Sequence, residues 1–265
     1  MTDFHLDASA SSPPVLGIAD GVATLTLNRP AHRNRLEEAD LQTLLRHFEQ
    51  INADLSVRVV VLTANTQGQP RPVFSSGYNV GDFDQTGAQP QRFERIPDAF
   101  AALRPITICA LNGSVYGGAT DLFVASDLRM ALHGVEFRMP ATALGLHYYP
   151  SGLQRYVNRL GMSFAKRAFL SARPFTAEQL WQNGCLEALV APGQWAPTLA
   201  DLVRDVQALA PLAVQATKRS LQELGAGVYD EPGLRAREQL TLDSADFAEG
   251  RRAFAERRPA QFHGR

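Results

Sequence analysis

Two glycine-bearing turns, each directly after a strongly apolar stretch, carry the residues of this sequence that are best placed to do chemistry. The first is VFSSGYNVGDF at 73–83, and the second is LNGSVYGGATDL at 111–122. Because glycine has no side chain, backbone N–H groups at such turns can face a cleft. Two N–H groups aimed at one negative oxygen form an oxyanion hole, in which each donor contributes roughly 3 to 4 kcal/mol to a transition state. Either turn alone is also typical of an ordinary strand-to-helix connection, but the pair predicts an oxyanion site.

Asp121, in the second of these turns, is the best candidate for a group that moves a proton. A helix is expected to begin near Gly118, because an amphipathic stretch follows, and this puts Asp121 in the first helical turn. A carboxylate there also stabilises the positive end of a helix by about 0.3 to 1 kcal/mol. A catalytic role and a purely structural role therefore both stay open.

A run of polar aromatic residues at 147–149 is expected to border the same cleft. Histidine carries protons near neutral pH, and His147 is the histidine that we expect in a segment facing the cleft. Tyr148 and Tyr149 either add hydrogen-bond donors to the cleft wall or pack as aromatic rings at the start of a helix. His147 and Tyr148 therefore join Asp121 as candidate catalytic residues.

The sequence argues against several other kinds of function. The 26 Lys and Arg residues and the 27 Asp and Glu residues give a net charge of -1 without a basic stripe, so nucleic acid is not an expected partner. No phosphate-binding GxxxxGK(S/T), dinucleotide-binding GxGxxG or nucleophilic GxSxG motif occurs. The two cysteines lie in apolar runs without metal-ligand spacing, and no signal peptide or membrane-spanning run is visible. We therefore expect a cytoplasmic protein that holds no metal and does not associate with a membrane.

Apolar strands alternate with amphipathic helices through the first half of the chain. The predicted strands are 22–27, 57–64, 106–111 and 127–132, and the predicted helices are 36–55, 96–103 and one from about residue 118. Such alternation indicates an α/β domain with largely parallel sheets, whose ligand groups lie at strand ends and helix starts. With 265 residues, of which 45% are hydrophobic, the chain can form one domain, or one domain with a helical appendage.

Both ends of the chain depart from this alternation. Residues 1–14 are small and polar and end in two prolines, which is typical of a loose leader. From residue 151 onward the pattern is almost wholly helical, and it predicts a terminal helix at about 234–258. The apolar side of that helix carries Leu240, Phe247 and Phe254. This side can pack on its own domain or on a neighbouring subunit.

Five stretches, in this order, resemble the landmarks of the enoyl-CoA hydratase/isomerase (crotonase) superfamily. They are LTLNRPAHRNRL, VVVLTA with VFSSGYNVGDF, ALNGSVYGGATDLFVASDLRMA, FRMPATALGLHYYPSGLQRYVNRLG and AEGRRAFAERRPAQFHGR, and they run from about Val22 to the C-terminus. The resemblance implies an α/β fold of the crotonase type, with a spiral of strand-strand-helix (ββα) units at 15–200 and a helical trimerisation region at 201–265. It also implies an acyl-CoA thioester as substrate, no cofactor beyond the coenzyme A of that substrate, and a homotrimer or a dimer of trimers.

The resemblance assigns roles to the two glycine turns. Members of the superfamily hold the thioester carbonyl between two backbone N–H groups, and these correspond here to Tyr78 and Gly118. The neighbouring residues Ser76, Gly77 and Gly117 are then expected to line the substrate. The shared chemistry is the stabilisation of an enolate oxygen, whichever bond is then made or broken.

Further substrate contacts follow from the same resemblance. Arg29 is similar to a position near the nucleotide end of coenzyme A, where it contacts a phosphate or is simply a surface cation. Ala141 and Tyr149 are expected to border the acyl group. The polar segment 81–95 resembles the variable segment that covers the acyl pocket, so we expect it to influence which acyl group is accepted.

The resemblance leaves the reaction open, because the acidic residues differ. Hydratases of the superfamily use two glutamates, and the matching positions here are Asp121 and Ala141. Alanine cannot transfer a proton, and Asp is shorter than Glu by about 1.5 Å, an error that can cost about a hundredfold in rate. Tyr148 matches a tyrosine of the superfamily's methylmalonyl-CoA decarboxylases, which however tend to carry His where this chain has Tyr78. A hydratase or isomerase, a decarboxylase and a non-catalytic acyl-CoA binder are therefore the functions to be distinguished.

Overall fold

The computed structural model describes residues 11–79 and 91–265, and a six-stranded sheet forms the centre of this part. Its strand order is β1-β2-β3-β5-β7-β10, and every neighbouring pair is parallel except β1 and β2. The strands are β1 (Val15–Ala19), β2 (Val22–Leu27), β3 (Val59–Ala64), β5 (Ile106–Leu111), β7 (Leu128–Leu132) and β10 (Ala188–Val190). The four predicted strands and the largely parallel sheet are thus confirmed, whereas β1 was not predicted.

A second, four-stranded sheet lies beside the first, in the order β4-β6-β8-β9. Its strands are β4 (Val73–Ser75), β6 (Ser114–Tyr116), β8 (Glu136–Arg138) and β9 (Phe175–Thr176). Each of β3, β5 and β7 in the large sheet is followed along the chain by one strand of the small sheet and then by a helix. The repeated ββα unit confirms the predicted spiral.

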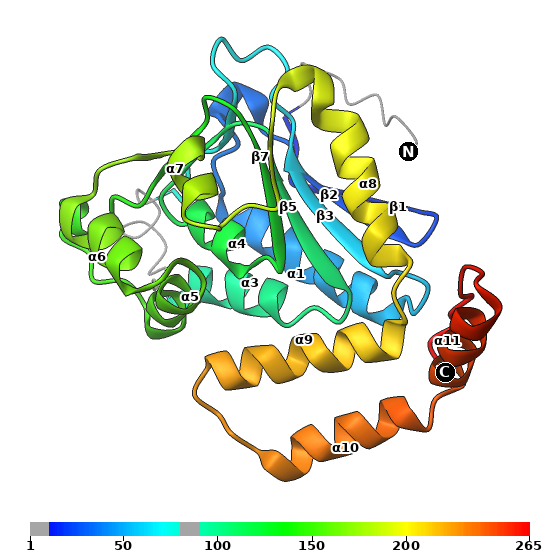
Figure 1. Cartoon of the computed structure of the whole chain (residues 1–265). Coiled ribbons are helices and arrows are strands. Elements are labelled where there is room, and N and C mark those ends of the chain that lie inside the picture. Colours follow the sequence, from blue (N-terminus) through cyan, green and yellow to red (C-terminus); the bar gives the residue numbers. More distant parts are fainter. Residues whose placement is uncertain (1–10, 80–90) are drawn as a thin grey trace.

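Helices cover both faces of the large sheet (Figure 1). Val60 and Leu62 of β3 pack into a cluster with α1, α3 and α4, whereas Val59 and Val61 pack on the opposite side against α8. This alternation explains why β3 and β5 are apolar at nearly every position, since both faces of these strands are buried. The helices of this part are α1 (Glu38–Ala53), α3 (Gln91–Ala101), α4 (Ala119–Ala125), α5 (Pro150–Leu160), α6 (Met162–Ser171), α7 (Ala177–Gln182) and α8 (Trp195–Gln207).

Three further helices project from the core at the C-terminal end (Figure 1): α9 (Pro211–Gly225), α10 (Glu231–Leu242) and α11 (Ala245–Glu256). The prediction of one helix at 234–258 is wrong, because the helix is interrupted between Leu242, the end of α10, and Ala245, the start of α11. The cause is Ser244, whose hydroxyl accepts the N–H of Phe247 at 3.0 Å and so starts a new helix. The boundary that we placed at residue 200 lies inside α8, which packs on the sheet, so the projecting region begins at α9.

The last residues of the predicted leader, 1–14, form hydrogen bonds with the core. Residues 1–10 lie outside the described residues. The N–H of Ser12 donates to the carbonyl of Asn28 at 2.8 Å, and the ring of His47 makes a 2.9 Å hydrogen bond to the carbonyl of Pro14. The chain is therefore attached to the core from Ser12 onward. Among the described residues, we find no helix that is long and apolar enough to span a membrane.

Candidate active site

The two glycine turns meet because they follow neighbouring parallel strands of the small sheet. β4 pairs with β6, and Ser75 lies opposite Val115. Gly77 has a φ of +96°, and a Cβ atom there would lie 2.8 Å from the carbonyl oxygen of Tyr116 and 3.3 Å from the backbone nitrogen of Gly118. A side chain at Gly77 would therefore push the turns apart, so glycine is required for both its conformation and its size.

Backbone bonds on either side of Tyr78 orient this residue. The N–H of Leu36 donates to the carbonyl of Gly77 at 2.9 Å, and the N–H of Asn79 donates to the carbonyl of Leu36 at 3.0 Å. These two bonds form a parallel bridge between Leu36 and Tyr78. Since successive N–H groups of an extended chain point to opposite sides, the N–H of Tyr78 is directed away from Leu36.

The second turn presents the N–H of Gly118 rather than that of Gly117. The N–H of Gly117 donates to the carbonyl of Arg138 at 3.0 Å. Gly118 caps the start of α4, and within the described part of the chain its N–H has no hydrogen-bond acceptor. The first N–H groups of a helix have no partner within the helix, so this donor can serve a ligand.

Phe93 of α3 covers the second turn. A Cβ atom at Gly118 would lie 2.7 Å from the Phe93 ring, so the ring rests directly on this glycine. The Phe93 ring centre is 5.4 Å from that of Tyr78 and 6.5 Å from that of Tyr149. Three aromatic side chains from separate elements therefore surround the two turns.

Asp121 is fully buried and is held by two other side chains. Its Oδ2 accepts the Tyr149 hydroxyl at 2.5 Å, while Arg155 donates from Nε to Oδ1 at 2.9 Å and from Nη2 to Oδ2 at 2.6 Å. The opposite side of the Arg155 guanidinium donates to Asp98 at 2.5 Å. The carboxylate predicted from the sequence thus lies in a network, and it is not open to solvent.

Sequence reasoning missed Arg155. The pattern of α5 places Gly152, Tyr156 and Leu160 on its buried side, four residues apart, with Arg155 at the border of that side. This spacing indicates a partly buried cation, but nothing in the sequence identifies Asp121, 34 positions away, as its partner.

Tyr148 and Tyr149 stack on each other, with ring centres 4.1 Å apart, and the Tyr148 hydroxyl donates to that of Tyr149 at 2.9 Å. Tyr148 is 5% exposed and packs on Phe169, whereas Tyr149 is half-buried. A Cβ atom at Gly152 would lie 2.6 Å from the Tyr149 ring and closer still to that of Tyr148, so this glycine makes room for the pair. Burial, and then the nearby Asp121 carboxylate, raise the pKa of both tyrosines well above 10, so both hydroxyls are neutral.

The remaining predicted residues have simpler surroundings. His147 is exposed, and no described residue forms a hydrogen bond with its ring. Ala141 is 5% exposed and begins a short 3-10 helix, Ala141–Leu144. Ser76 is exposed, and its N–H donates to the carbonyl of Arg33 at 2.9 Å. Their predicted roles remain predictions.

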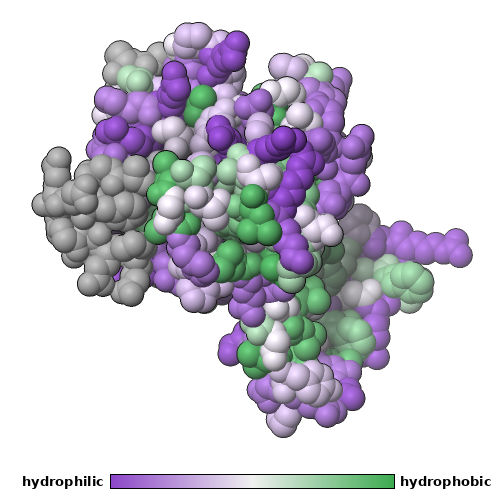
Figure 2. Space-filling view, turned by 90° about the vertical axis from the view of Figure 1, so that its left-hand side faces the viewer, coloured by the Kyte–Doolittle hydropathy of each residue, from purple (hydrophilic) through white to green (hydrophobic). Residues whose placement is uncertain are grey.

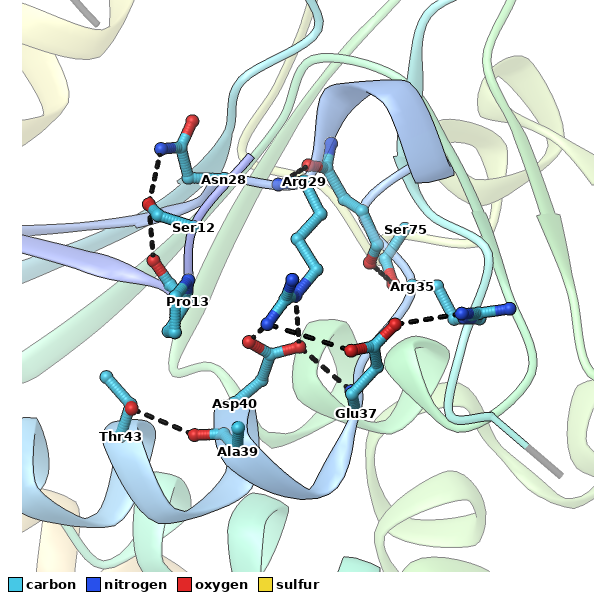
Figure 3. A network of polar contacts seen from close by, with 11 residues as sticks. Ser12, Pro13, Asn28, Arg29, Arg35, Glu37, Ala39, Asp40, Thr43 and Ser75 are labelled. Carbon is cyan, nitrogen blue, oxygen red and sulfur yellow. Dashed lines mark hydrogen bonds and ion pairs between the residues drawn. The ribbon is translucent and has the colours of Figure 1, made fainter. Parts of the chain in front are cut away.

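Arg29 belongs to a separate ion-pair network (Figure 3). Its Nε lies 3.0 and 2.9 Å from the two carboxylate oxygens of Asp40, and its Nη2 lies 3.7 Å from Glu37. The hydrogen bond to Asp40 raises the pKa of Arg29. This cation already has a buried counter-charge that holds the start of α1, so the contacts favour a structural role, and the predicted phosphate contact stays a prediction.

Two further predictions from the sequence concern the segment that covers the acyl pocket and the absence of a metal site. Residues 81–90 of the predicted covering segment lie outside the described residues, and residues 91–95 belong to α3. Within the described residues, no cluster of His, Cys, Asp and Glu could hold a metal ion.

Comparison with known proteins shows the family of this chain. The model of the enoyl-CoA hydratase/isomerase family matches residues 17–265. The 2,3-dehydroadipyl-CoA hydratase of Escherichia coli is 30% identical over 250 residues, 92% of this chain and 96% of that protein, and the methylmalonyl-CoA decarboxylase of the same organism is 26% identical, over 92% and 95%. A crystal structure of an enoyl-CoA hydratase/isomerase family protein from Hyphomonas neptunium has a TM-score of 0.86, 28% identity and coverage of 96% and 98%. Since the family match includes both glycine turns and the projecting helices, this chain belongs to the enoyl-CoA hydratase/isomerase family.

Proposed function

We propose that the protein stabilises the enolate of an acyl-CoA thioester between the N–H groups of Tyr78 and Gly118. The observation that carries this proposal is the contact of Gly77 with Gly118, which brings the two turns to one place. A thioester carbonyl gains negative charge on oxygen when its α-carbon becomes nucleophilic. Two fixed N–H donors then bind the transition state more tightly than the ground state.

A decarboxylation is the second candidate, and the burial of Asp121 favours it. This carboxylate is 0% exposed and already accepts bonds from Arg155 and Tyr149, and the other acid position is Ala141. Hydration needs a group that positions and deprotonates water. A buried Asp121 that is already paired, together with Ala141, is poorly suited to that task. Loss of carbon dioxide from a carboxylated acyl group produces the enolate directly and needs no such base. The similarity to a methylmalonyl-CoA decarboxylase supports the same candidate.

One panel of assays separates these functions. Purified protein is mixed with saturated, 2,3-unsaturated, 3,4-unsaturated and α-carboxylated acyl-CoAs, and hydration, double-bond shift and loss of carbon dioxide are followed separately. Isothermal calorimetry with the same compounds measures binding. Turnover of only the α-carboxylated compounds supports a decarboxylase, and hydration or double-bond shift supports a hydratase or isomerase. Binding without turnover indicates a non-catalytic acyl-CoA protein, and absence of binding contradicts all three.

We also propose that the protein acts as a homotrimer or a dimer of trimers in the cytoplasm, without a cofactor beyond the coenzyme A of its substrate. The projecting helices support the assembly, because they expose apolar side chains: Leu240 is 54% exposed, Phe247 41% and Phe254 87%. Figure 2 shows hydrophobic surface on this projecting part of the molecule. Exposed apolar surface of this kind marks contacts with other chains.

A further inference from the structure

The Asp121 carboxylate is closed off from the cleft by its own partners. Its two oxygens accept three hydrogen bonds, two from Arg155 and one from Tyr149, and the residue has no exposed surface. Tyr149, in contrast, is half-buried and lies beside Phe93, which rests on Gly118. Of Asp121, Tyr148 and Tyr149, the last is therefore the one that combines exposed surface with a ring beside Phe93.

The direction of the hydrogen bonds in this network is fixed by chemistry. An ionised carboxylate can only accept, so the hydroxyl of Tyr149 must donate to Asp121. Because a tyrosine has a single hydroxyl proton, the oxygen of Tyr149 must then accept the hydroxyl of Tyr148, as the 2.9 Å contact shows. The orientation of the Tyr149 hydroxyl therefore depends on where the Asp121 carboxylate is held.

Arg155 holds that carboxylate and joins the three helices around the site. Its planar guanidinium uses Nε and Nη2 for Asp121 on α4 and Nη1 for Asp98 on α3, while Arg155 itself lies on α5. Asp98 shares α3 with Phe93, and Tyr149 directly precedes α5. A guanidinium can make these contacts in one plane, which a lysine ammonium cannot. One side chain thus links the elements that carry Phe93, Asp121 and Tyr149.

We propose that Arg155, anchored by Asp98, is a positioning residue for the thioester site, and that it acts by fixing Asp121 so that the Tyr149 hydroxyl meets the acyl end of the substrate. This inference rests on the proposed function. It differs from the sequence-based expectation, which gave the catalytic role to Asp121, Tyr148 and His147. Here Tyr149 contacts the substrate, whereas Asp121, Arg155 and Tyr148 hold Tyr149 in place.

The test compares Arg155→Lys with Arg159→Lys by steady-state kinetics on the acyl-CoA that the wild-type protein turns over. Arg159 is a matched control, because it lies one turn further along α5 and lines the same 670 Å³ cavity as Arg155 and Asp98, without contacting Asp121. We expect Arg155→Lys to lower kcat about tenfold or more with KM nearly unchanged, because a displacement near 1 Å can cost about a hundredfold in rate. For Arg159→Lys both constants should stay near the wild-type values.

Two further variants separate positioning from a general effect on folding. Asp98→Asn keeps the pair of Arg155 with Asp121 and changes a side chain that is 42% exposed, so the protein should fold normally while kcat still falls. Tyr149→Phe should lower kcat in the wild-type background but cause little further loss in Arg155→Lys, since the hydroxyl is already misplaced there. If the ion pair of Arg155 had only a structural role, the losses of kcat from Arg155→Lys and Tyr149→Phe would be independent and would multiply in the double variant.

The inference is overturned if Arg155→Lys and Arg159→Lys change kcat equally, or if the losses from Arg155→Lys and Tyr149→Phe multiply. Should Arg155→Lys fail to fold, Asp98→Asn combined with Tyr149→Phe gives the same comparison. Failure of the proposed function is seen in the wild-type protein itself, as absence of turnover in the assay panel. The two failures are therefore distinguished by which protein shows them.

Discussion

Lys218 and Asp127 form a buried ion pair that attaches the projecting helix α9 to the start of β7, with Nζ and Oδ2 2.7 Å apart. Lys218 is 8% exposed and also donates to the carbonyl of Pro105 at 2.8 Å. Burial lowers the pKa of Lys218, and the Asp127 carboxylate opposes that effect. We expect Lys218→Met to lower the free energy of unfolding by about 3 to 5 kcal/mol, because it leaves Asp127 without its buried counter-charge.

The neighbouring residue supplies the control for this prediction. Arg219 pairs with Glu223 at 2.9 Å, but its side chain is 72% exposed. Arg219→Met should therefore cost less than about 1 kcal/mol. Urea unfolding of the two variants gives the comparison, and equal losses of stability would refute the structural role of the buried pair.

Gly77 allows a test of the oxyanion site that needs no change of a polar side chain. In Gly77→Ala, the added Cβ atom meets the carbonyl of Tyr116 at 2.8 Å and the residue keeps an unfavourable positive φ, so the two turns must separate. We expect kcat/KM to fall about a hundredfold, which is the scale of losing one oxyanion donor. Gly134→Ala is the control, because φ there is +78° but no atom lies within 4 Å of the added carbon. Similar losses of kcat/KM in the two variants would show that backbone strain, and not separation of the two glycine turns, explains the effect.

The buried tyrosines predict a loss of stability in alkali. Burial, as the largest cause, raises the pKa of Tyr148, Tyr149 and Tyr156 well above 10 in the folded protein. The unfolded chain then binds fewer protons than the native one as the pH rises through about 10, so the free energy of unfolding decreases there. Their stabilising contribution is fully present below that pH. Melting temperatures measured from pH 8 to 11 check this, and Tyr156→Phe should make the decline shallower; a melting temperature that is independent of pH would contradict it.

Phe254 is expected to lie in the subunit interface of the proposed assembly. Its ring is 87% exposed on α11, and we expect Phe254→Asp to lower the mass of the assembly in analytical ultracentrifugation, since an apolar contact is replaced by a charge. Leu170, which is 78% exposed on α6, provides the control variant Leu170→Asp, and this should keep the wild-type mass. An unchanged mass for Phe254→Asp would place the interface elsewhere.

Patterns that depend on burial alone could be predicted from the sequence. The strand at 106–111 was predicted with the bounds that the structure shows, because all its side chains are buried and apolar. The contact between the two glycine turns followed from their positions after apolar strands. The single terminal helix was predicted wrongly, since helical spacing continues across residues 243 and 244 and only the cap at Ser244 reveals the break.

For the network around Asp121, the sequence predicted several of the residues but not the contacts between them. Asp121, Tyr148 and Tyr149 were all selected, and the structure brings them together. How the two tyrosines pack at the start of α5 depends on the space left by Gly152, since a Cβ atom there would lie 2.6 Å from the Tyr149 ring. The partner of Asp121 could not be found, because pairing between distant helices leaves no periodic signal in the sequence.

The small sheet positions the two glycine turns, whereas helices carry the side chains beside them. Gly77 and Gly118 follow adjacent strands of one small sheet, so the spacing of the two turns is set by a hydrogen-bonded ladder. The side chains of the network beside these turns, Phe93, Asp121 and Tyr149, belong to α3, α4 and the start of α5. Under the proposed function, substitutions in these helices can therefore change which acyl group is accepted, or which reaction follows, while the sheet keeps the two turns at the same spacing.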